Sequence, residues 1–262
     1  MKRFKAVVFD WAGTMIDFGS FAPMGVFVEA FRRFGVEASI AEARAPMGAP
    51  KRDHIRSMLF AQRLAGEWQR VHGVAPSEID VDRVYEVFVP MNEEVVANFG
   101  ALVPGAREAV EQLRSMGLRI GSTTGYTRSI MNRLLPVAAA QGYTPDNLVC
   151  ADDLPEGRPG PLGMYRCFID LCVYPPSTVV KVDDTEPGIA EGVAAGCLTV
   201  GVALSGNYVG KTSEELARMS ADEVATLRAF ATGKLLAAGA DHVIDTVADL
   251  PDLLTRLDMA MS

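Results

Sequence analysis

Short strand patterns alternate with helix patterns along most of the chain, and this alternation is the feature that most restricts its fold. Apolar segments typical of buried strands occur at residues 6–9, 118–121, 148–150, 178–182 and 198–202. Because parallel strands are joined by crossover helices that cover the sheet, the pattern predicts an α/β fold with a doubly wound parallel sheet. A further short strand is predicted at residues 242–244.

The long segment between the first two strands contains only helix patterns. Its periodicity predicts helices at residues 23–34, 40–45, 50–64 and 81–99, the last with a kink at Pro90. We therefore expect two domains: a Rossmann-like core of residues 1–19 and 100–262, and a helical domain of residues 20–99 inserted in the first crossover. Core helices are also predicted at residues 104–116, 221–236 and 247–257.

Composition excludes several classes of protein. The chain has 262 residues, of which 49% are hydrophobic, and its net charge of −8 argues against a broad surface for nucleic acid or anionic membranes. No secretory leader pattern occurs, and no apolar run reaches the ~20 residues of a membrane span, so we expect a cytoplasmic protein. Reduced thiols in or near the core are expected for the cysteines, which lack metal-ligand spacing: Cys150, Cys167, Cys172 and Cys197.

Asp10 directly follows the first strand and precedes Gly13 and Thr14. An aspartate at the carboxyl end of a buried parallel strand points into the crevice where open α/β sheets bind ligands, and Gly13 permits a sharp turn there. This position suits a nucleophile. The alternative is an aspartate that only caps the next helix.

Polar residues also follow three later strands, where they would face Asp10. Residues 122–128 offer hydroxyl and backbone N–H groups that suit phosphate oxygens, although a plain helix cap has the same composition. Asp183 and Asp184 form an acidic pair that favours a divalent cation. Arg158 lies in a turn and would bind an anion, unless it is an ordinary solvated arginine.

The order of these groups resembles the haloacid dehalogenase superfamily of aspartate-nucleophile phosphotransferases. The four motifs of that superfamily match Asp10, Thr124, Arg158 and Asp184, and a helical cap follows the first motif. Within the superfamily, the chain is similar to the phosphonoacetaldehyde hydrolase family, which acts in phosphonate catabolism. The segments that carry this similarity are residues 9–14, 21–23, 46–48, 51–54 and 121–126.

The resemblance implies hydrolysis of the carbon–phosphorus bond of phosphonoacetaldehyde to acetaldehyde and phosphate. Lys51, carried by the cap, would form a Schiff base with the aldehyde, and Asp10 would attack phosphorus to give an aspartyl phosphate. The resemblance also implies Mg²⁺ held by Asp10, the main-chain carbonyl of Ala12 and Asp184, and a homodimer formed through the cap. The implied substrate contacts are Met47, Thr124, Gly125, Tyr126 and Arg158.

Ala12 departs from the superfamily pattern, which places a general-acid aspartate two residues after the nucleophile. Alanine neither donates nor accepts a proton. A carbon leaving group would explain this, because a carbanion needs an electron sink such as a protonated lysine imine. The alternatives are a phosphomonoesterase, a dehalogenase, or a degenerate homologue that binds a phosphorylated ligand without turnover.

Lys51 follows Pro50, which favours the first position of a helix. The positive end of the helix dipole would then disfavour the ammonium form of Lys51. We expect Arg44, Arg52 and Arg56 to act in the same direction. A solvated surface lysine is the alternative.

His54 and Met47 are candidate helpers of Lys51. His54 lies three residues later on about the same helix face, where it would relay a proton or activate water, unless it is an ordinary surface histidine. Met47 would pack against the lysine or the substrate, with core packing as the alternative.

The fourth motif also departs from the superfamily, which commonly carries another acid where this chain has Gly188. Asp183 and Glu186 are the candidates to replace that acid, so only Asp184 is assigned as a metal ligand from this segment. The sequence assigns no role to Ser20.

Overall fold

Five parallel strands form the single sheet of the computed structural model, which describes residues 4–259. The strand order is β2-β1-β3-β4-β5, so the chain leaves β1 in one direction and later returns to pair on its other side. Such a reversal creates a crevice at the carboxyl ends of the central strands. The predicted doubly wound parallel sheet is thereby confirmed. The strands are β1 (Ala6–Phe9), β2 (Arg119–Ser122), β3 (Val179–Asp183), β4 (Leu198–Val202) and β5 (His242–Ile244).

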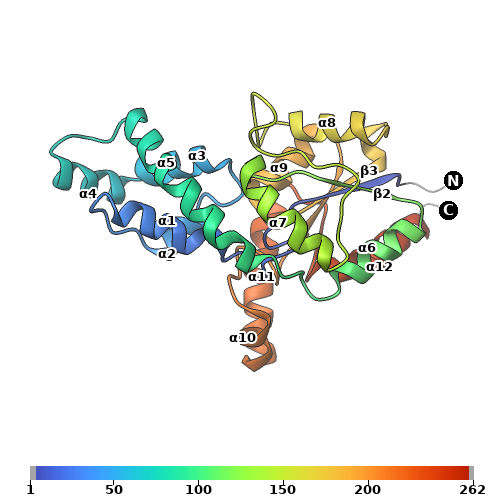
Figure 1. The fold of residues 1–262 in the computed structure, drawn as a ribbon. Coiled ribbons are helices and arrows are strands. Elements are labelled where there is room, and N and C mark those ends of the chain that lie inside the picture. Colours follow the sequence, from blue (N-terminus) through green and yellow to red (C-terminus); the bar gives the residue numbers. More distant parts are fainter. Residues whose placement is uncertain (1–3, 260–262) are drawn as a thin grey trace.

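Helices cover both faces of the sheet (Figure 1). Because side chains alternate along a strand, Val7 and Phe9 pack toward α6, α7 and α12, whereas Ala6 and Val8 pack toward α8. The core helices are α6 (Ala106–Ser115), α7 (Arg128–Ala140), α8 (Leu162–Asp170), α9 (Glu186–Ala195), α10 (Ser213–Arg218), α11 (Ala221–Ala237) and α12 (Leu250–Met259). Short 3-10 helices lie at η1 (Val96–Phe99), η2 (Pro176–Thr178) and η3 (Val247–Asp249).

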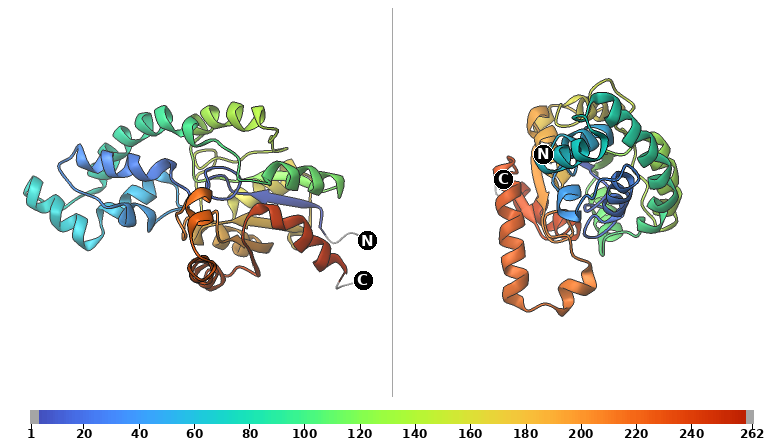
Figure 2. Two further views of the ribbon diagram at one scale, coloured as in Figure 1. Left: turned by 90° about the horizontal axis from the view of Figure 1, so that it is seen from below. Right: turned by 90° about the vertical axis from the view of Figure 1, so that its left-hand side faces the viewer.

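Five further helices form a separate body at one end of the molecule, away from the two chain termini (Figures 1 and 2). These helices are α1 (Ala22–Arg32), α2 (Ile40–Arg44), α3 (Lys51–Leu59), α4 (Gln62–His72) and α5 (Glu78–Val95). They enclose their own apolar cluster, with Phe27, Phe88 and Trp68 among its buried members. We call residues 22–95 the helical unit. The domain limits predicted from the sequence stay a prediction, and residues 1–3 and 260–262 of the predicted core lie outside the described residues.

The predicted strand at residues 148–150 is wrong. Only one bridge forms there, between Thr123 and Val149. The Ile120 N–H, which faces this segment from β2, donates to the Asp146 carboxylate at 2.8 Å, and the Ala151 N–H donates to the Tyr126 carbonyl, so no ladder extends from the bridge. A side chain that binds nearby backbone in this way competes with a sheet ladder.

The helical unit also differs from its prediction. The helix expected at residues 50–64 ends at Leu59, and α4 begins after Ala61, whose extended backbone interrupts the helix. No glycine or proline marks this break. Helix α5 starts three residues earlier than expected because Ser77 and Asp80 form a capping box.

All four cysteines are free, as expected, but Cys172 is exposed, so its predicted place in or near the core is wrong. None of the described helices is both long and apolar enough to span a membrane.

Candidate active site

A cavity lies where the carboxyl ends of β1, β2 and β3 meet the helical unit. It brings together residues that are far apart in sequence, from both bodies of the molecule. Its lining includes all five residues predicted to contact substrate, together with two of the three predicted metal-site residues and the predicted Schiff-base lysine. The full lining is Asp10, Ala12, Met47, Gly48, Lys51, Thr124, Gly125, Tyr126, Arg158 and Thr185.

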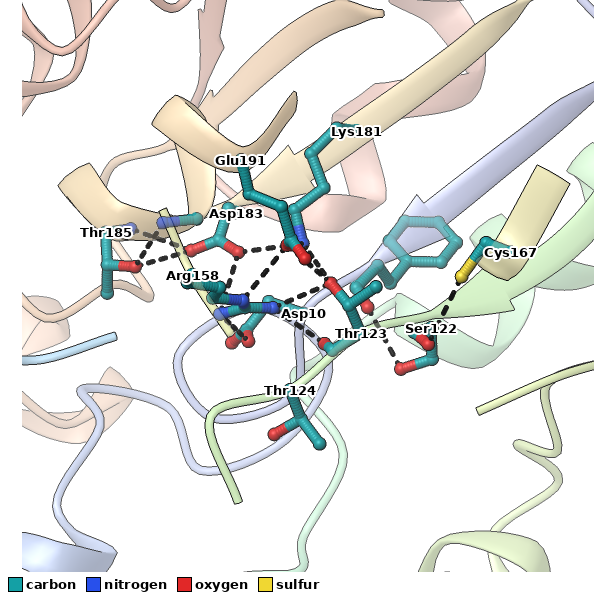
Figure 3. Close-up of polar contacts among 12 residues, drawn as sticks. Asp10, Ser122, Thr123, Thr124, Arg158, Cys167, Lys181, Asp183, Thr185 and Glu191 are labelled. Carbon is teal, nitrogen blue, oxygen red and sulfur yellow. Dashed lines mark hydrogen bonds and ion pairs between the residues drawn. The ribbon is translucent and has the colours of Figure 1, made fainter. Parts of the chain in front are cut away.

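Asp10 and Arg158 face each other at the base of this site (Figure 3). The Arg158 Nη1 donates to the Asp10 carboxylate at 2.8 Å, and its Nη2 donates to the carbonyl and hydroxyl oxygens of Thr123. Ion pairs to Asp183 at 3.3 Å and Glu191 at 3.0 Å complete its surroundings. Arg158 is therefore a buried arginine with carboxylate partners, and the alternative of a solvated arginine is wrong.

Three buried carboxylates, those of Asp10, Asp183 and Asp184, approach within 4.8 Å of one another. Burial, and then the charge of Asp183, raise the pKa of Asp10 to about 6 although Arg158 opposes the change. Burial and its two acidic neighbours raise the pKa of Asp184 well above its usual value. Such a concentration of negative charge is relieved by a cation. The donor set of oxygen atoms therefore fits a divalent metal.

Asp183 takes the space beside Gly188. A Cβ atom at position 188 would lie 1.9 Å from the Asp183 Oδ2, so the missing side chain of Gly188 makes room for this carboxylate. Arg158 and Lys181 hold the pKa of Asp183 below its usual value despite burial. Glu186, the other candidate acid, is exposed. Of the two, only Asp183 belongs to the acidic cluster.

Lys51 is the first residue of α3, directly after Pro50, and its side chain is buried in the cavity. Burial lowers the pKa of Lys51 to about 8, and the charge of Arg158 acts in the same direction. The ammonium nitrogen lies 4.8 Å from the centre of the Tyr126 ring. The alternative of a solvated surface lysine is therefore wrong.

The expected influence of three nearby arginines on Lys51 is also wrong. Arg52 pairs with Asp82 at 2.7 Å, and Arg56 pairs with Glu78 at 2.5 Å, so carboxylates of α5 balance both charges. Arg44 turns toward the core instead, where its Nη1 donates to the Gly19 carbonyl at 2.9 Å. Burial, a property of the tertiary fold, lowers the pKa of Lys51.

His54 is fully buried beneath Lys51 and does not line the cavity. Its ring stacks on Phe27 at 3.9 Å, and its Nε2 lies 2.8 Å from the Ala43 carbonyl, so Nε2 carries a proton and donates it. Burial and the Lys51 charge lower the pKa of His54 well below its usual value. It is a neutral core histidine and not a surface one, and its catalytic role stays a prediction.

The turn after β2 supplies fewer free donors than its sequence indicates. The Thr124 N–H donates to the Val149 carbonyl, and the Tyr126 N–H donates to the Thr124 hydroxyl. Within residues 4–259 the Gly125 N–H has no acceptor. The Thr124 hydroxyl and the Gly125 N–H therefore remain to bind an anion in the cavity.

The helical unit touches the core through glycines at three places. A Cβ atom at Gly48 would lie 2.2 Å from the Thr185 hydroxyl, one at Gly125 would lie 3.0 Å from the Ala49 carbonyl, and one at Gly157 would lie 2.9 Å from Pro50. Side chains at these positions would hold the two bodies apart. In this structure the helical unit is therefore closed against the core.

Lys181 and Glu191 belong to the site although the sequence interpretation missed them. The fully buried Lys181 Nζ contacts the Thr123 hydroxyl at 2.6 Å and both Asp183 and Glu191 at 3.1 Å (Figure 3). Glu191 in turn binds Arg158. A lysine within the apolar strand β3 was the available signal, because an unpaired charge there would be costly.

Comparisons with known proteins agree with this geometry. A family model described as haloacid dehalogenase-like hydrolase matches residues 4–196. The phosphonoacetaldehyde hydrolases of Paraburkholderia phytofirmans and Klebsiella pneumoniae are 51% and 46% identical, over 100% of this chain and 98% of each relative. A solved phosphonoacetaldehyde hydrolase-like protein from Oleispira antarctica is 42% identical, with a TM-score of 0.96 over 99% of this chain and 94% of that one. The chain therefore belongs to the phosphonoacetaldehyde hydrolase family of haloacid dehalogenase-like hydrolases.

Proposed function

We propose that this enzyme hydrolyses the carbon–phosphorus bond of phosphonoacetaldehyde to acetaldehyde and phosphate. The observation that carries the proposal is a buried lysine of lowered pKa in the same cavity as Asp10. Ala12 lines that cavity and offers no proton to a leaving alkoxide. A lysine that accepts electrons through an imine suits a carbon leaving group. The names of the relatives at 44–51% identity support the same substrate.

The neutral amine of Lys51 attacks the aldehyde carbon, and loss of water gives a protonated imine. A carboxylate oxygen of Asp10 then attacks phosphorus, while the electron pair of the phosphorus–carbon bond moves into the imine and forms an enamine. Water hydrolyses the resulting aspartyl phosphate. Protonation of the enamine carbon and hydrolysis of the imine release acetaldehyde and restore Lys51.

Three groups hold the phosphonyl oxygens during this sequence: the Arg158 guanidinium, the Thr124 hydroxyl and the Gly125 N–H. Their closeness to Asp10 in the cavity lining supports these roles. Met47 and Tyr126 line the same cavity beside Lys51, where they would exclude water from the imine. His54 is buried next to Lys51 and would relay a proton during imine formation.

Asp10, the Ala12 carbonyl and Asp184 would hold Mg²⁺, the hard cation that prefers such oxygen ligands. When bound, the ion supplies positive charge against the repulsion between these carboxylates and the phosphonyl oxygens. Two other proposals are a homodimer formed through the helical unit, which rests on the resemblance alone, and a cytoplasmic location, which the sequence predicts.

The direct test is to incubate the purified enzyme with phosphonoacetaldehyde and to measure phosphate and acetaldehyde together. We expect equal amounts of both products. A phosphomonoesterase would instead release phosphate from phosphate esters, and a dehalogenase would release halide. Turnover of either class of compound without turnover of phosphonoacetaldehyde would overturn the proposed function.

We expect a chelator to abolish phosphate release and added Mg²⁺ to restore it. Asp184→Ala removes a ligand, so the half-saturating Mg²⁺ concentration should rise by roughly tenfold or more, or activity should be lost. Calorimetric titration of Mg²⁺ measures the same loss without turnover. The exposed Asp222, replaced with alanine, controls for the removed charge. Full activity of the wild type in excess chelator would contradict the metal site.

The lowered pKa of Lys51 predicts a specific pH dependence. Because only the neutral amine is nucleophilic, acetylation of Lys51 should increase with pH and reach half its maximum near pH 8, where burial places its pKa. Below that pH the amine is protonated and the reaction slows tenfold per pH unit. Mass spectrometry of the labelled peptides measures the rate, with the exposed Lys234 as internal reference. A midpoint above about pH 10, the value of an ordinary lysine, would contradict the lowered pKa.

A further inference from the structure

The loop that follows β4, residues 205–210, lies at the junction between the core and the helical unit. Its Ser205 carbonyl accepts the Gly19 N–H at 2.7 Å, at the entrance to the helical unit. The Ser205 hydroxyl donates to the Gly13 carbonyl at 2.7 Å, in the turn that follows the nucleophile. The loop therefore connects the start of the helical unit with the Asp10 turn.

Asn207 extends this connection to Asp184. Its backbone N–H donates to the Asp184 Oδ2 at 2.8 Å, and the other carboxylate oxygen accepts the Thr14 hydroxyl at 3.2 Å. Asn207 itself is 6% exposed. A Cβ atom at Gly206 would lie 2.7 Å from that of Asp184, so the loop packs closely against the aspartate. The position of Asn207 thus determines where one oxygen of Asp184 is held.

Arg44, the last residue of α2, holds Asn207 from the helical unit. Its Nη1 donates to the Gly19 carbonyl at 2.9 Å and to both the carbonyl and the side-chain oxygen of Asn207 at 3.2 Å. The Asn207 Nδ2 returns a bond to the Arg44 carbonyl at 3.3 Å. A Cβ atom at Gly210 would lie 2.8 Å from the guanidinium carbon. Both ends of Asn207 are therefore bound by one residue of the helical unit.

The surroundings of Arg44 are unusual for an arginine. Among residues 4–259 it forms no ion pair, although most arginines of the helical unit do. Its guanidinium lies 5.1 Å from the centre of the Phe21 ring and within the field of the Asp17 and Asp184 carboxylates, whose charges oppose the effect of burial on its pKa. The hydrogen bonds of its Nη1 go to core residues, Gly19 and Asn207. They therefore hold the helical unit to the core and do not stabilise the helical unit itself.

We propose that Arg44 and Asn207 form a latch that couples closure of the helical unit to the placement of the Asp184 carboxylate. Movement of the helical unit away from the core breaks the bonds of Arg44 to Asn207, and the loop that holds Asp184 then loses its support. Lys51 and Asp184 therefore reach their working positions in one event. Arg44 and Asn207 are positioning residues, and this role rests on the proposed function.

The test uses Arg44→Met, Asn207→Ala and the double variant, with Arg63→Met as matched control. Arg63 contacts Glu42 and Glu67, both within the helical unit, so its replacement removes the same charge without touching the junction. Hydrogen–deuterium exchange of the peptides that span residues 13–22 and 203–210 is measured without substrate. We expect faster exchange of both peptides in the two latch variants and wild-type exchange in the control.

The second measurement is the affinity for Mg²⁺ by calorimetry, together with kcat and KM. Each latch variant should bind Mg²⁺ more weakly and raise KM by roughly tenfold, and the double variant should resemble the worse single variant, because both residues act through one contact. Thermal midpoints close to that of the wild type would show that the fold is intact.

Several outcomes would overturn the latch. These are unchanged exchange at residues 203–210, fully additive effects in the double variant, or an equal effect of Arg63→Met. Failure of the wild type to turn over phosphonoacetaldehyde would overturn the proposed function instead. The exchange and calorimetric measurements need no substrate, so the two failures are distinguishable.

Discussion

Replacement of Lys51 with arginine is expected to lower turnover of phosphonoacetaldehyde by ~10⁴-fold or more, equivalent to at least ~5 kcal/mol of barrier. The guanidinium keeps the positive charge in the cavity, but it stays protonated and forms no useful imine. The variant therefore separates the electron sink from simple attraction of the phosphonate. Initial rates of acetaldehyde release measure the effect, with Lys234→Arg as an exposed control.

The imine itself is detectable because borohydride reduces it. Borohydride added together with phosphonoacetaldehyde should inactivate the wild type and leave an adduct on the peptide that contains Lys51, whereas borohydride alone should not. An adduct on another lysine, or a Lys51→Arg rate within about tenfold of the wild type, would overturn the Schiff-base mechanism. An aspartate-nucleophile hydrolase of another substrate class would then be the remaining interpretation.

Asp10→Asn should make turnover undetectable while it leaves imine formation intact. The amide preserves the shape of the side chain but is too weak a nucleophile to attack phosphorus at a useful rate. Since Lys51 is untouched, reductive trapping with borohydride should still label it. Phosphate release and mass spectrometry of the trapped protein measure the two effects separately.

The same substitution has a predictable effect on stability. It removes one of three mutually repelling carboxylates, and Arg158 keeps Asp183 and Glu191 as partners. In the absence of metal, the thermal midpoint should therefore not fall. A stable variant that retains more than about a tenth of wild-type activity, a barrier increase of only ~1.4 kcal/mol, would exclude Asp10 as the nucleophile.

The sequence alone determined the elements and motifs whose signals are local. Periodicity located the five strands of the sheet and the helices α1, α2 and α5 of the inserted segment to within a few residues, but it overran the end of α3 and missed α4. The position of Asp10 at the end of a strand placed it in the crevice, because parallel strands share their carboxyl edge. Pro50 likewise placed Lys51 at the start of α3.

Local signals failed where distant partners decide the outcome. Residues 148–150 have strand composition, but the Asp146 carboxylate takes the Ile120 N–H that a ladder between this segment and β2 would use. The helix break near Ala61 carries no glycine or proline signal. The arginines near Lys51 looked like a cause of its lowered pKa, yet the carboxylates that balance Arg52 and Arg56 belong to α5.

Only the tertiary structure decided how the charges of the site are arranged. Asp10 and Arg158 are 148 residues apart, and Arg44 and Asn207 are 163 apart, so packing alone brings each pair together. Gly188 illustrates the point: its lack of a side chain looked like the loss of an acid, whereas the fold places the Asp183 carboxylate in that space. Sequence patterns encode the backbone within a few residues, but burial and the partner of each charge depend on which surfaces meet when the sheet and the helical unit pack.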